Sequence, residues 1–216
     1  MVKHSIGHHI TLKTHQVVDK DGTLRRIPGA RIGWLMKTQI ALLRAVNVGG
    51  TGKIAMADLR DFMEALGFTD VRTLIQTGNI VFESDTSSGA ELEVFLEQEA
   101  LNRLGLDTTF LIRTPGEWED VIKANPFHDK AHDDPRRLQV MALKEAPAAE
   151  KVQLLEEAIS GPERVHAWDK HLFIDNPDGS GNSKLTNVLI ERKLETRSTS
   201  RNWNTVLKIS AMAQDV

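Results

Sequence analysis

A glycine-rich stretch with polar side chains at both ends is the first place in this sequence where ligand chemistry is expected. Arg44 and Asn47 end an apolar run, and Lys53 precedes a helical pattern. Between them lie Gly49 and Gly50. Backbone N–H groups in a glycine loop and at a helix N-terminus attract anions. The stretch therefore predicts a loop that holds an anion or a polar ligand. The alternative is a tight strand-to-helix turn that needs glycine for its backbone alone.

This stretch does not match a nucleotide P-loop. Gly52 and Lys53 fit the last glycine and the lysine of G-x-x-x-x-G-K-[ST]. Asn47 stands at the first glycine, and Ile54 stands where a hydroxyl would hold magnesium. We therefore exclude a Walker-type NTPase.

Three polar residues beside the glycine stretch could line the same site. A charge within an apolar strand needs a partner, so Arg44 predicts either a ligand contact or an ion pair, with Asp58 as the candidate partner. Gln76 and Asn79 flank a hairpin turn at Gly78. These two side chains could bind a ligand, but turn geometry alone also explains them.

A second glycine-rich stretch, residues 175–185, also precedes a helical pattern. Asn182 or Ser183 would cap this helix, and Lys184 would lie in its first turn, where a cation opposes the helix dipole. A bound anion would explain Lys184, and an ordinary surface lysine is the alternative.

The C-terminal segment is basic. Residues 184–208 hold six Lys and Arg against two Glu, an excess of four in a chain of net charge −3. Arg201, Asn202 and Trp203 place a cation, an amide and an aromatic ring together, and such a cluster can bind phosphate or stack a base. A core role for Trp203 is the alternative.

Several kinds of chemistry find little support. The chain has no cysteine, which excludes disulfides, thiolate nucleophiles and cysteine-based metal sites. His128 and His132 are one helical turn apart, but Pro126 and Pro135 flank them and favour a solvated loop over a metal site. No serine, threonine or lysine is paired with a base by any motif, so neither a catalytic set nor a cofactor is predicted.

The hydrophobic pattern that must position these residues reads twice as β-α-β-β-α-β, the ferredoxin-like order of an α+β protein. The first pass has strands at 39–48, 71–75, 80–83 and 108–113, with helices at 56–66, 89–104 and 118–124. The second pass has strands at 137–143, 163–168, 171–175 and near 196, with helices at 148–159, 183–194 and 202–211. We expect a first half at 36–124, a linker at 125–136, and a second half with a C-terminal helix at 137–216.

Residues 1–35 are expected to form a loose, irregular extension. Asp21 and Gly22 could turn a weak hairpin between residues 16–19 and 23–27. Met36 directly precedes the first strong strand, so translation starting there is one expectation for this region. No apolar run approaches the length of a membrane span or a signal peptide, and we expect a cytoplasmic protein without a membrane partner.

Two blocks of the sequence resemble the bacterial family known as domain of unknown function 1697. They are IALLRAVNVGG at 40–50 and IQTGNIVF at 75–82, where Ala45 and Thr77 replace a usual glycine and serine. The resemblance runs from about Met36 to the C-terminus. It implies two ferredoxin-like halves and supplies no reaction.

These observations together predict a binding module for a phosphate-bearing ligand, either a nucleotide or a nucleic acid. Two other functions stay open. One is an enzyme of unrecognised chemistry in a cleft between the halves, because polar side chains gather at strand ends. The other is a self-associating or partner-binding protein, because ferredoxin-like sheets often pair.

Overall fold

The computed structural model describes residues 16–18, 24–26, 36–47, 52–85 and 89–214, and the findings below concern these residues. Within residues 1–35, the described residues form an antiparallel hairpin of β1 (Gln16–Val18) and β2 (Leu24–Arg26). The predicted hairpin is confirmed, while its Asp21–Gly22 turn lies outside the described residues. Residues 36–216 form a separate compact unit.

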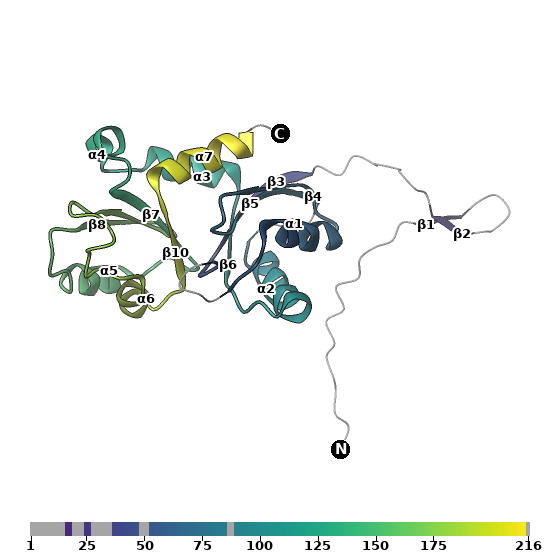
Figure 1. Ribbon diagram of the computed structural model, residues 1–216, viewed down its shortest axis with the longest axis horizontal. Coiled ribbons are helices and arrows are strands. Elements are labelled where there is room, and N and C mark those ends of the chain that lie inside the picture. Colours follow the sequence, from purple (N-terminus) through teal and green to yellow (C-terminus); the bar gives the residue numbers. More distant parts are fainter. Residues whose placement is uncertain (1–15, 19–23, 27–35, 48–51, 86–88, 215–216) are drawn as a thin grey trace, which may run out of the picture. The chain divides into compact units, whose positions relative to one another are not determined.

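The first sheet of this unit is antiparallel, with strand order β4-β5-β3-β6 (Figure 1). Its strands are β3 (Lys37–Leu43), β4 (Thr69–Leu74), β5 (Asn79–Ser84) and β6 (Phe110–Arg113). Helices α1 (Met56–Ala65) and α2 (Ala90–Leu104) cover one face. They cover it because the apolar side of each helix, such as Leu59 and Leu96, packs in one cluster with Ala41 and Leu43 of β3.

The second sheet has the equivalent order, β10-β7-β9-β8. Its strands are β7 (Leu138–Leu143), β8 (Arg164–Trp168), β9 (His171–Asp175) and β10 (Ser198–Asn202). Helices α5 (Ala149–Glu156) and α6 (Asn187–Leu194) bring Leu155 and Ile190 into a cluster with Met141 and Leu143. In both sheets the fourth strand lies beside the first, which confirms the predicted α+β class and the ferredoxin-like order. Below, "first half" and "second half" mean each sheet with its helices.

A central apolar cluster joins the two halves. It combines the opposite faces of both sheets, including Ile40 and Leu42 of β3 and Val140 and Phe173 of the second sheet. Helices α3 (Pro115–Lys123) and α7 (Trp203–Gln214) contact each other and pack against this cluster (Figure 1). Trp203 belongs to the cluster and is only 5% exposed, so its role is in the core.

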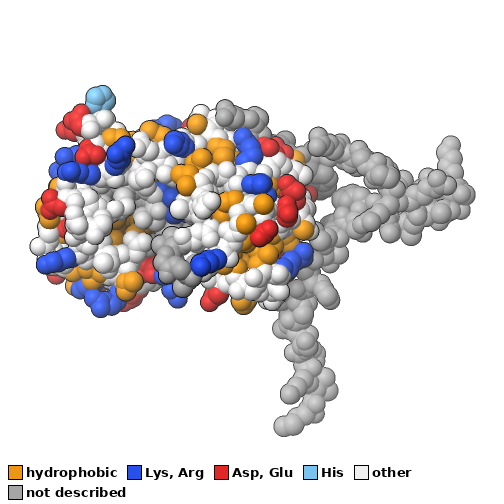
Figure 2. Space-filling view, in the orientation of Figure 1, with side chains coloured by type: hydrophobic (Ala, Val, Ile, Leu, Met, Phe, Trp, Pro, Cys, Tyr) orange, Lys and Arg blue, Asp and Glu red, His pale blue; other side chains and the backbone are white. Residues whose placement is uncertain are grey.

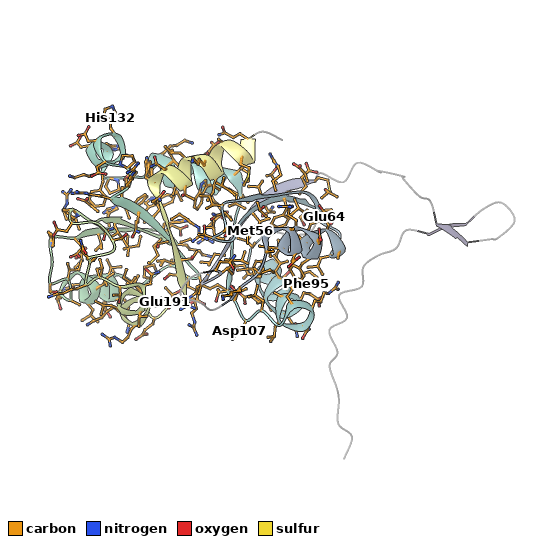
Figure 3. The ribbon with its side chains drawn as sticks, viewed as in Figure 1. Met56, Glu64, Phe95, Asp107, His132 and Glu191 are labelled. Carbon is orange, nitrogen blue, oxygen red and sulfur yellow. The ribbon has the colours of Figure 1, made fainter. Side chains whose placement is uncertain are left out.

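One local prediction in the linker is wrong, because α4 (His128–Asp133) forms where a loop was expected. Pro126 precedes the N-cap and Pro135 follows the C-cap, so neither ring disturbs a helical hydrogen bond. His132 projects from α4 into solvent (Figure 3). Its Nδ1 lies 2.8 Å from Oδ1 of Asp133. In the described parts of the chain, no group of three or more His, Asp or Glu side chains is placed to hold a metal.

The start of α6 also differs from the prediction, since neither Asn182 nor Ser183 caps it. Thr186 is the N-cap, and its Oγ1 accepts a hydrogen bond from the backbone N–H of Leu189 at 3.3 Å. Ser183 instead accepts from the N–H of Leu185 at 3.0 Å. The hydroxyl of Ser183 is thus used in a turn before the helix.

The surface shows charges of both signs, and acidic and basic side chains are spread together over the face in Figure 2. Among the helices that the structure describes, none combines the length and apolar composition needed to cross a bilayer.

Candidate functional site

Arg201 lies at the contact between the halves. Its Nη2 donates hydrogen bonds to the carbonyl oxygens of Leu43 at 3.1 Å and Thr77 at 3.0 Å, both in the first half. Its Nε donates to Oδ1 of Asn79, the first residue of β5. Its Nη1 donates to Oγ1 of Thr199 at 2.8 Å. A side chain of β10 therefore binds the end of β3 and the β4–β5 turn.

The charge of Arg201 is buried and has no carboxylate partner among the described residues. The residue is only 8% exposed, and its N–H groups bind carbonyl, hydroxyl and amide oxygens. Burial lowers the pKa of Arg201 to about 10, so the guanidinium stays protonated at neutral pH. The result is an uncompensated positive charge between the halves.

Arg44 is the second cation at this junction, and it is paired. Its Nε and Nη2 donate to the two carboxylate oxygens of Glu191 at 2.6 and 2.8 Å. Glu191 lies on α6 (Figure 3). The predicted ion pair thus exists, but Asp58 as its partner is wrong. Asp58 lies on α1 of the same half, whereas the end of β3 reaches α6 of the other half.

The carboxylate of Glu191 is held by more than Arg44. Its Oε1 also accepts hydrogen bonds from the backbone N–H of Ser198 at 2.8 Å and from its hydroxyl at 3.2 Å. Burial alone would raise the pKa of Glu191, but the hydrogen bonds from Arg44 and Ser198 outweigh it and lower the pKa. The hydrogen bond to Glu191 likewise raises the pKa of Arg44. Both groups are therefore charged at neutral pH.

A cleft of about 540 Å³ opens at this junction, and we call it the Arg201 cleft. Three predicted site residues, Arg44, Arg201 and Asn202, line it together. Most of its other lining side chains carry hydroxyl or amide groups, namely Thr77, Gln139, Asn187, Ser198, Thr199, Ser200 and Thr205. Two helices also begin at the cleft: α6 at Asn187 and α7 just after Asn202, whose Oδ1 accepts from the N–H of Thr205 at 2.9 Å.

A second group of predicted residues, Asn47, Lys53 and Gln76, lines a separate cavity of about 710 Å³. Asn47 does not present a free amide there. Its Nδ2 donates to the carbonyl oxygens of Ile54 at 2.8 Å and Gln76 at 3.0 Å, and its Oδ1 accepts from the N–H of Ile54 at 3.0 Å. Asn47 therefore has a structural role, in which it links Ile54 to Gln76. Gly49 and Gly50 lie outside the described residues.

The remaining predicted residues fall elsewhere. The Ser183 hydroxyl donates to Oε1 of Glu163, and Lys184 is exposed before the start of α6. Asn79 is completely buried, where its Nδ2 donates to the carbonyl oxygen of Leu74 at 2.9 Å. Asn79 thus supports Arg201 from below the cleft.

Arg113 was not singled out from the sequence. It lies in the first half and makes, with the second half, the contacts that Arg201 makes with the first half. Its Nη2 donates across the junction to the carbonyl oxygens of Leu143 at 2.7 Å and Lys170 at 3.2 Å. Its Nη1 donates to the carbonyl of the preceding residue, Ile112, as Nη1 of Arg201 does to Ser200. Its Nε donates to Nε2 of His171 at 3.1 Å.

The equivalence extends along the junction. Leu143 ends β7 as Leu43 ends β3, and His171 begins β9 as Asn79 begins β5. Lys144, the residue after Leu143, reaches Glu97 on α2 at 2.6 Å, as Arg44 reaches Glu191 on α6. Contacts that are returned in this way define a two-fold, isologous interface. The two halves of one chain therefore pack like the subunits of a symmetric dimer.

Comparison with known proteins agrees with this architecture. Residues 36–173 match the family described as "Protein of unknown function (DUF1697)". The chain belongs to the DUF1697 family. Its fold is similar to that of the conserved bacterial protein SP0830 from Streptococcus pneumoniae, with a TM-score of 0.66 and 23% sequence identity over 82% of this chain and 99% of that chain. No curated protein matches the chain.

The departure from the DUF1697 pattern at Ala45 has a structural counterpart. Ala45 has a φ of 56°, in the left-handed region that glycine adopts without steric cost. Gly52 has a φ of 59°, and a Cβ there would lie 2.8 Å from the carbonyl oxygen of Ala45. Backbone geometry thus accounts for the small residues Ala45 and Gly52 in this chain.

Proposed function

We propose that the Arg201 cleft binds a small phosphate-bearing ligand. The observation that supports this most is the buried, uncompensated charge of Arg201 beneath a cleft lined by hydroxyl and amide groups. Arg44 and Glu191 neutralise each other, so Arg201 leaves the cleft side chains with one net positive charge. A low-dielectric wall strengthens the attraction between that charge and an anion.

Arg201 would not contact the ligand directly, because its N–H groups already donate hydrogen bonds to protein oxygens. Other groups in the cleft would make the direct contacts. Nη1 of Arg44 has no acceptor among the described residues, and Arg44 is 29% exposed. The side chains of Ser200 and Asn187 also line the cleft without a hydrogen bond to the described residues. The N-termini of α6 and α7 add partial positive charge at the same place.

The size and the walls of the cleft favour a small molecule over a nucleic acid. Small-molecule sites usually enclose about 300–1,000 Å³, and the cleft has about 540 Å³. Trp203 is buried in the central cluster, so it offers no platform for stacked bases. Ile75 instead provides an apolar wall: it lines the cleft, is 51% exposed, and holds a φ of 59° that is strained for a β-branched residue.

The test is calorimetric titration at low salt with inorganic phosphate, nucleoside monophosphates and a short single-stranded oligonucleotide. Ser200→Glu places a negative charge in the cleft, and Ser200→Gln is the matched control of equal size. We expect a monophosphate to bind the unmodified chain and Ser200→Gln, and to bind Ser200→Glu at least about tenfold more weakly, which corresponds to about 1.4 kcal/mol.

Two results would contradict the proposal: no binding of any phosphate compound at low salt, or equal binding by the Glu and Gln variants. A preference for the oligonucleotide, with steep salt dependence, would replace the small molecule by nucleic acid.

A further inference from the structure

The two-fold relation between the halves creates a second cavity, at the position equivalent to the Arg201 cleft. It encloses about 270 Å³ between β6 and α3 of the first half and the β8–β9 turn of the second, and we call it the His171 cavity. Arg113 and His171 line this cavity. They are hydrogen-bonded to each other, and they are the equivalents of Arg201 and Asn79 at the Arg201 cleft. The two sites differ in their chemistry, although they occupy equivalent places.

We propose that the His171 cavity is a second ligand site, for a small zwitterion of the α-amino acid class. The site is separate from the Arg201 cleft and shares no lining residue with it. The inference therefore does not depend on the function proposed for that cleft.

His171 carries the first part of the argument, because it has a buried hydrogen-bond donor without a partner. The residue is 1% exposed and lines the cavity, and its Nδ1 has no hydrogen-bond partner. Nε2 accepts from the permanently charged Arg113, so the proton of the neutral ring is on Nδ1. The equivalent residue, Asn79, has its Nδ2 donor satisfied by Leu74 and Thr77. An acceptor on a ligand, such as a carboxylate, would satisfy His171 as well.

The charges around the cavity carry the second part. Glu93 is already held by Lys144 at 3.0 Å and by the N–H of Ile112 at 2.8 Å, so it is not available to a ligand. Asp120 and Asp169 are exposed carboxylates in the lining, and Trp168 adds an aromatic wall. Carboxylates and an aromatic face together attract an ammonium group.

Groups of the opposite sign lie in the same lining. Lys170 is exposed and has no acidic partner among the described residues. The cavity also contains the start of α2, whose N-cap Gly89 provides no side-chain cap. A helix N-terminus and a lysine attract a carboxylate. A cavity of this volume with acceptors for an ammonium group and donors for a carboxylate fits a molecule that carries both.

The test is titration of the full chain with each protein amino acid at millimolar concentration, followed by calorimetry and by NMR of the ¹⁵N-labelled histidine rings. We expect at least one amino acid to bind and to shift the Nδ1–H resonance of His171. The double variant Asp120→Asn, Asp169→Asn should bind it at least about tenfold more weakly, because the carboxylates that attract the ammonium group are lost. Both positions are exposed, so the fold should be retained.

Matched variants separate this site from the other one. His171→Asn copies the residue that the first half carries at the equivalent position, and it should fold and bind more weakly. Ser200→Glu, in the Arg201 cleft, should leave amino acid binding unchanged. Failure of every amino acid to bind would overturn the proposal, as would binding that is indifferent to the Asp120, Asp169 variant or lost in Ser200→Glu.

Discussion

Nε of Arg201 donates a hydrogen bond to Oδ1 of Asn79, which joins the last strand of the second sheet to the first residue of β5. Arg113 makes the equivalent bond to His171, so an amide at one junction is replaced by an imidazole at the other. Burial of a guanidinium is tolerated at both places because strand ends and turns supply carbonyl oxygens in fixed positions. The interface between the halves thus combines the central apolar cluster with two polar networks, each built around one arginine.

Replacing Arg201 should destabilise the chain strongly. Arg201→Met removes the donor to Oδ1 of the buried Asn79 and to the carbonyl oxygen of Thr77, and we expect a loss of about 3 kcal/mol in the free energy of unfolding. Urea unfolding followed by circular dichroism measures it. Arg197→Met, at an exposed position, is the control and should change stability by less than about 0.5 kcal/mol. Equal effects at the two positions would show that the Arg201 network is unimportant.

His171 should make the stability of the chain depend on pH. Burial, together with the charges of Arg113 and Lys170, lowers its pKa from 6.5 to about 3. Below pH 6.5 the unfolded chain therefore takes up a proton that the folded chain does not, and stability falls as the pH falls. The loss is about 1.4 kcal/mol per pH unit, or about 2 kcal/mol between pH 6.5 and 5. Urea unfolding at these pH values should show a much smaller loss in His171→Asn. An identical loss in both proteins would contradict the assignment.

Arg44 and Glu191 should be coupled, but modestly. Their side chains are 29% and 12% exposed, so water and salt screen part of the attraction. A double-mutant cycle with Arg44→Gln and Glu191→Gln should give a coupling free energy of about 1 kcal/mol. The coupling should shrink in high salt. A value near zero at low salt would mean that the bidentate geometry does not persist in solution.

Two glycines allow steric clash to be separated from backbone strain. Gly78 has a φ of +70°, and a Cβ added there would lie 2.7 Å from Cβ of Leu43. Gly105 has a φ of +62°, with nothing within 4 Å of such a Cβ. Gly105→Ala should therefore cost about 1 kcal/mol from its backbone alone, and Gly78→Ala at least about 2 kcal/mol. Thermal unfolding of both variants measures the two losses. A larger loss for Gly105→Ala than for Gly78→Ala would contradict the prediction.

Ala45→Gly should stabilise the chain despite removing a methyl group. Ala45 has a φ of 56° and is exposed, so the substitution relieves strain and loses little packing. The unfolded chain gains freedom in exchange, and we expect a net gain of about 0.5 kcal/mol. Chemical denaturation would detect it, and a clear loss would show that the Ala45 methyl group packs in solution.

The features predicted correctly from sequence are those that depend on neighbouring residues. The hairpin turn expected at Gly78 joins β4 to β5, and Gly78 adopts a positive φ there. Periodicity located both sheets because apolar side chains repeat with the period of each element. The start of α6 was mistaken because Ser183 and Thr186 are both capping residue types, and only contacts with distant residues decide between them.

The site could be predicted only in part, because its contacts join residues far apart in the chain. Arg44 was expected to have a partner, but Glu191 lies 147 positions away, and nothing local distinguishes it from other glutamates. Arg113 had one available signal that went unused. Both it and Arg201 stand directly before a helix cap, in Arg113-Thr114-Pro115 and Arg201-Asn202-Trp203, so the two halves could have been aligned on their arginines.

The central cluster has a consequence for synthesis on the ribosome. Its covering helix α7 is made after both sheets, yet it packs against β3 and β5, which are made much earlier. A nascent chain that has completed the first sheet therefore still exposes Ile40, Leu42 and Val81 to water, except where α3 of its own half covers them. Such a chain carries an aggregation-prone face until α7 has been translated, so ribosome stalling within the second half should increase its dependence on chaperones.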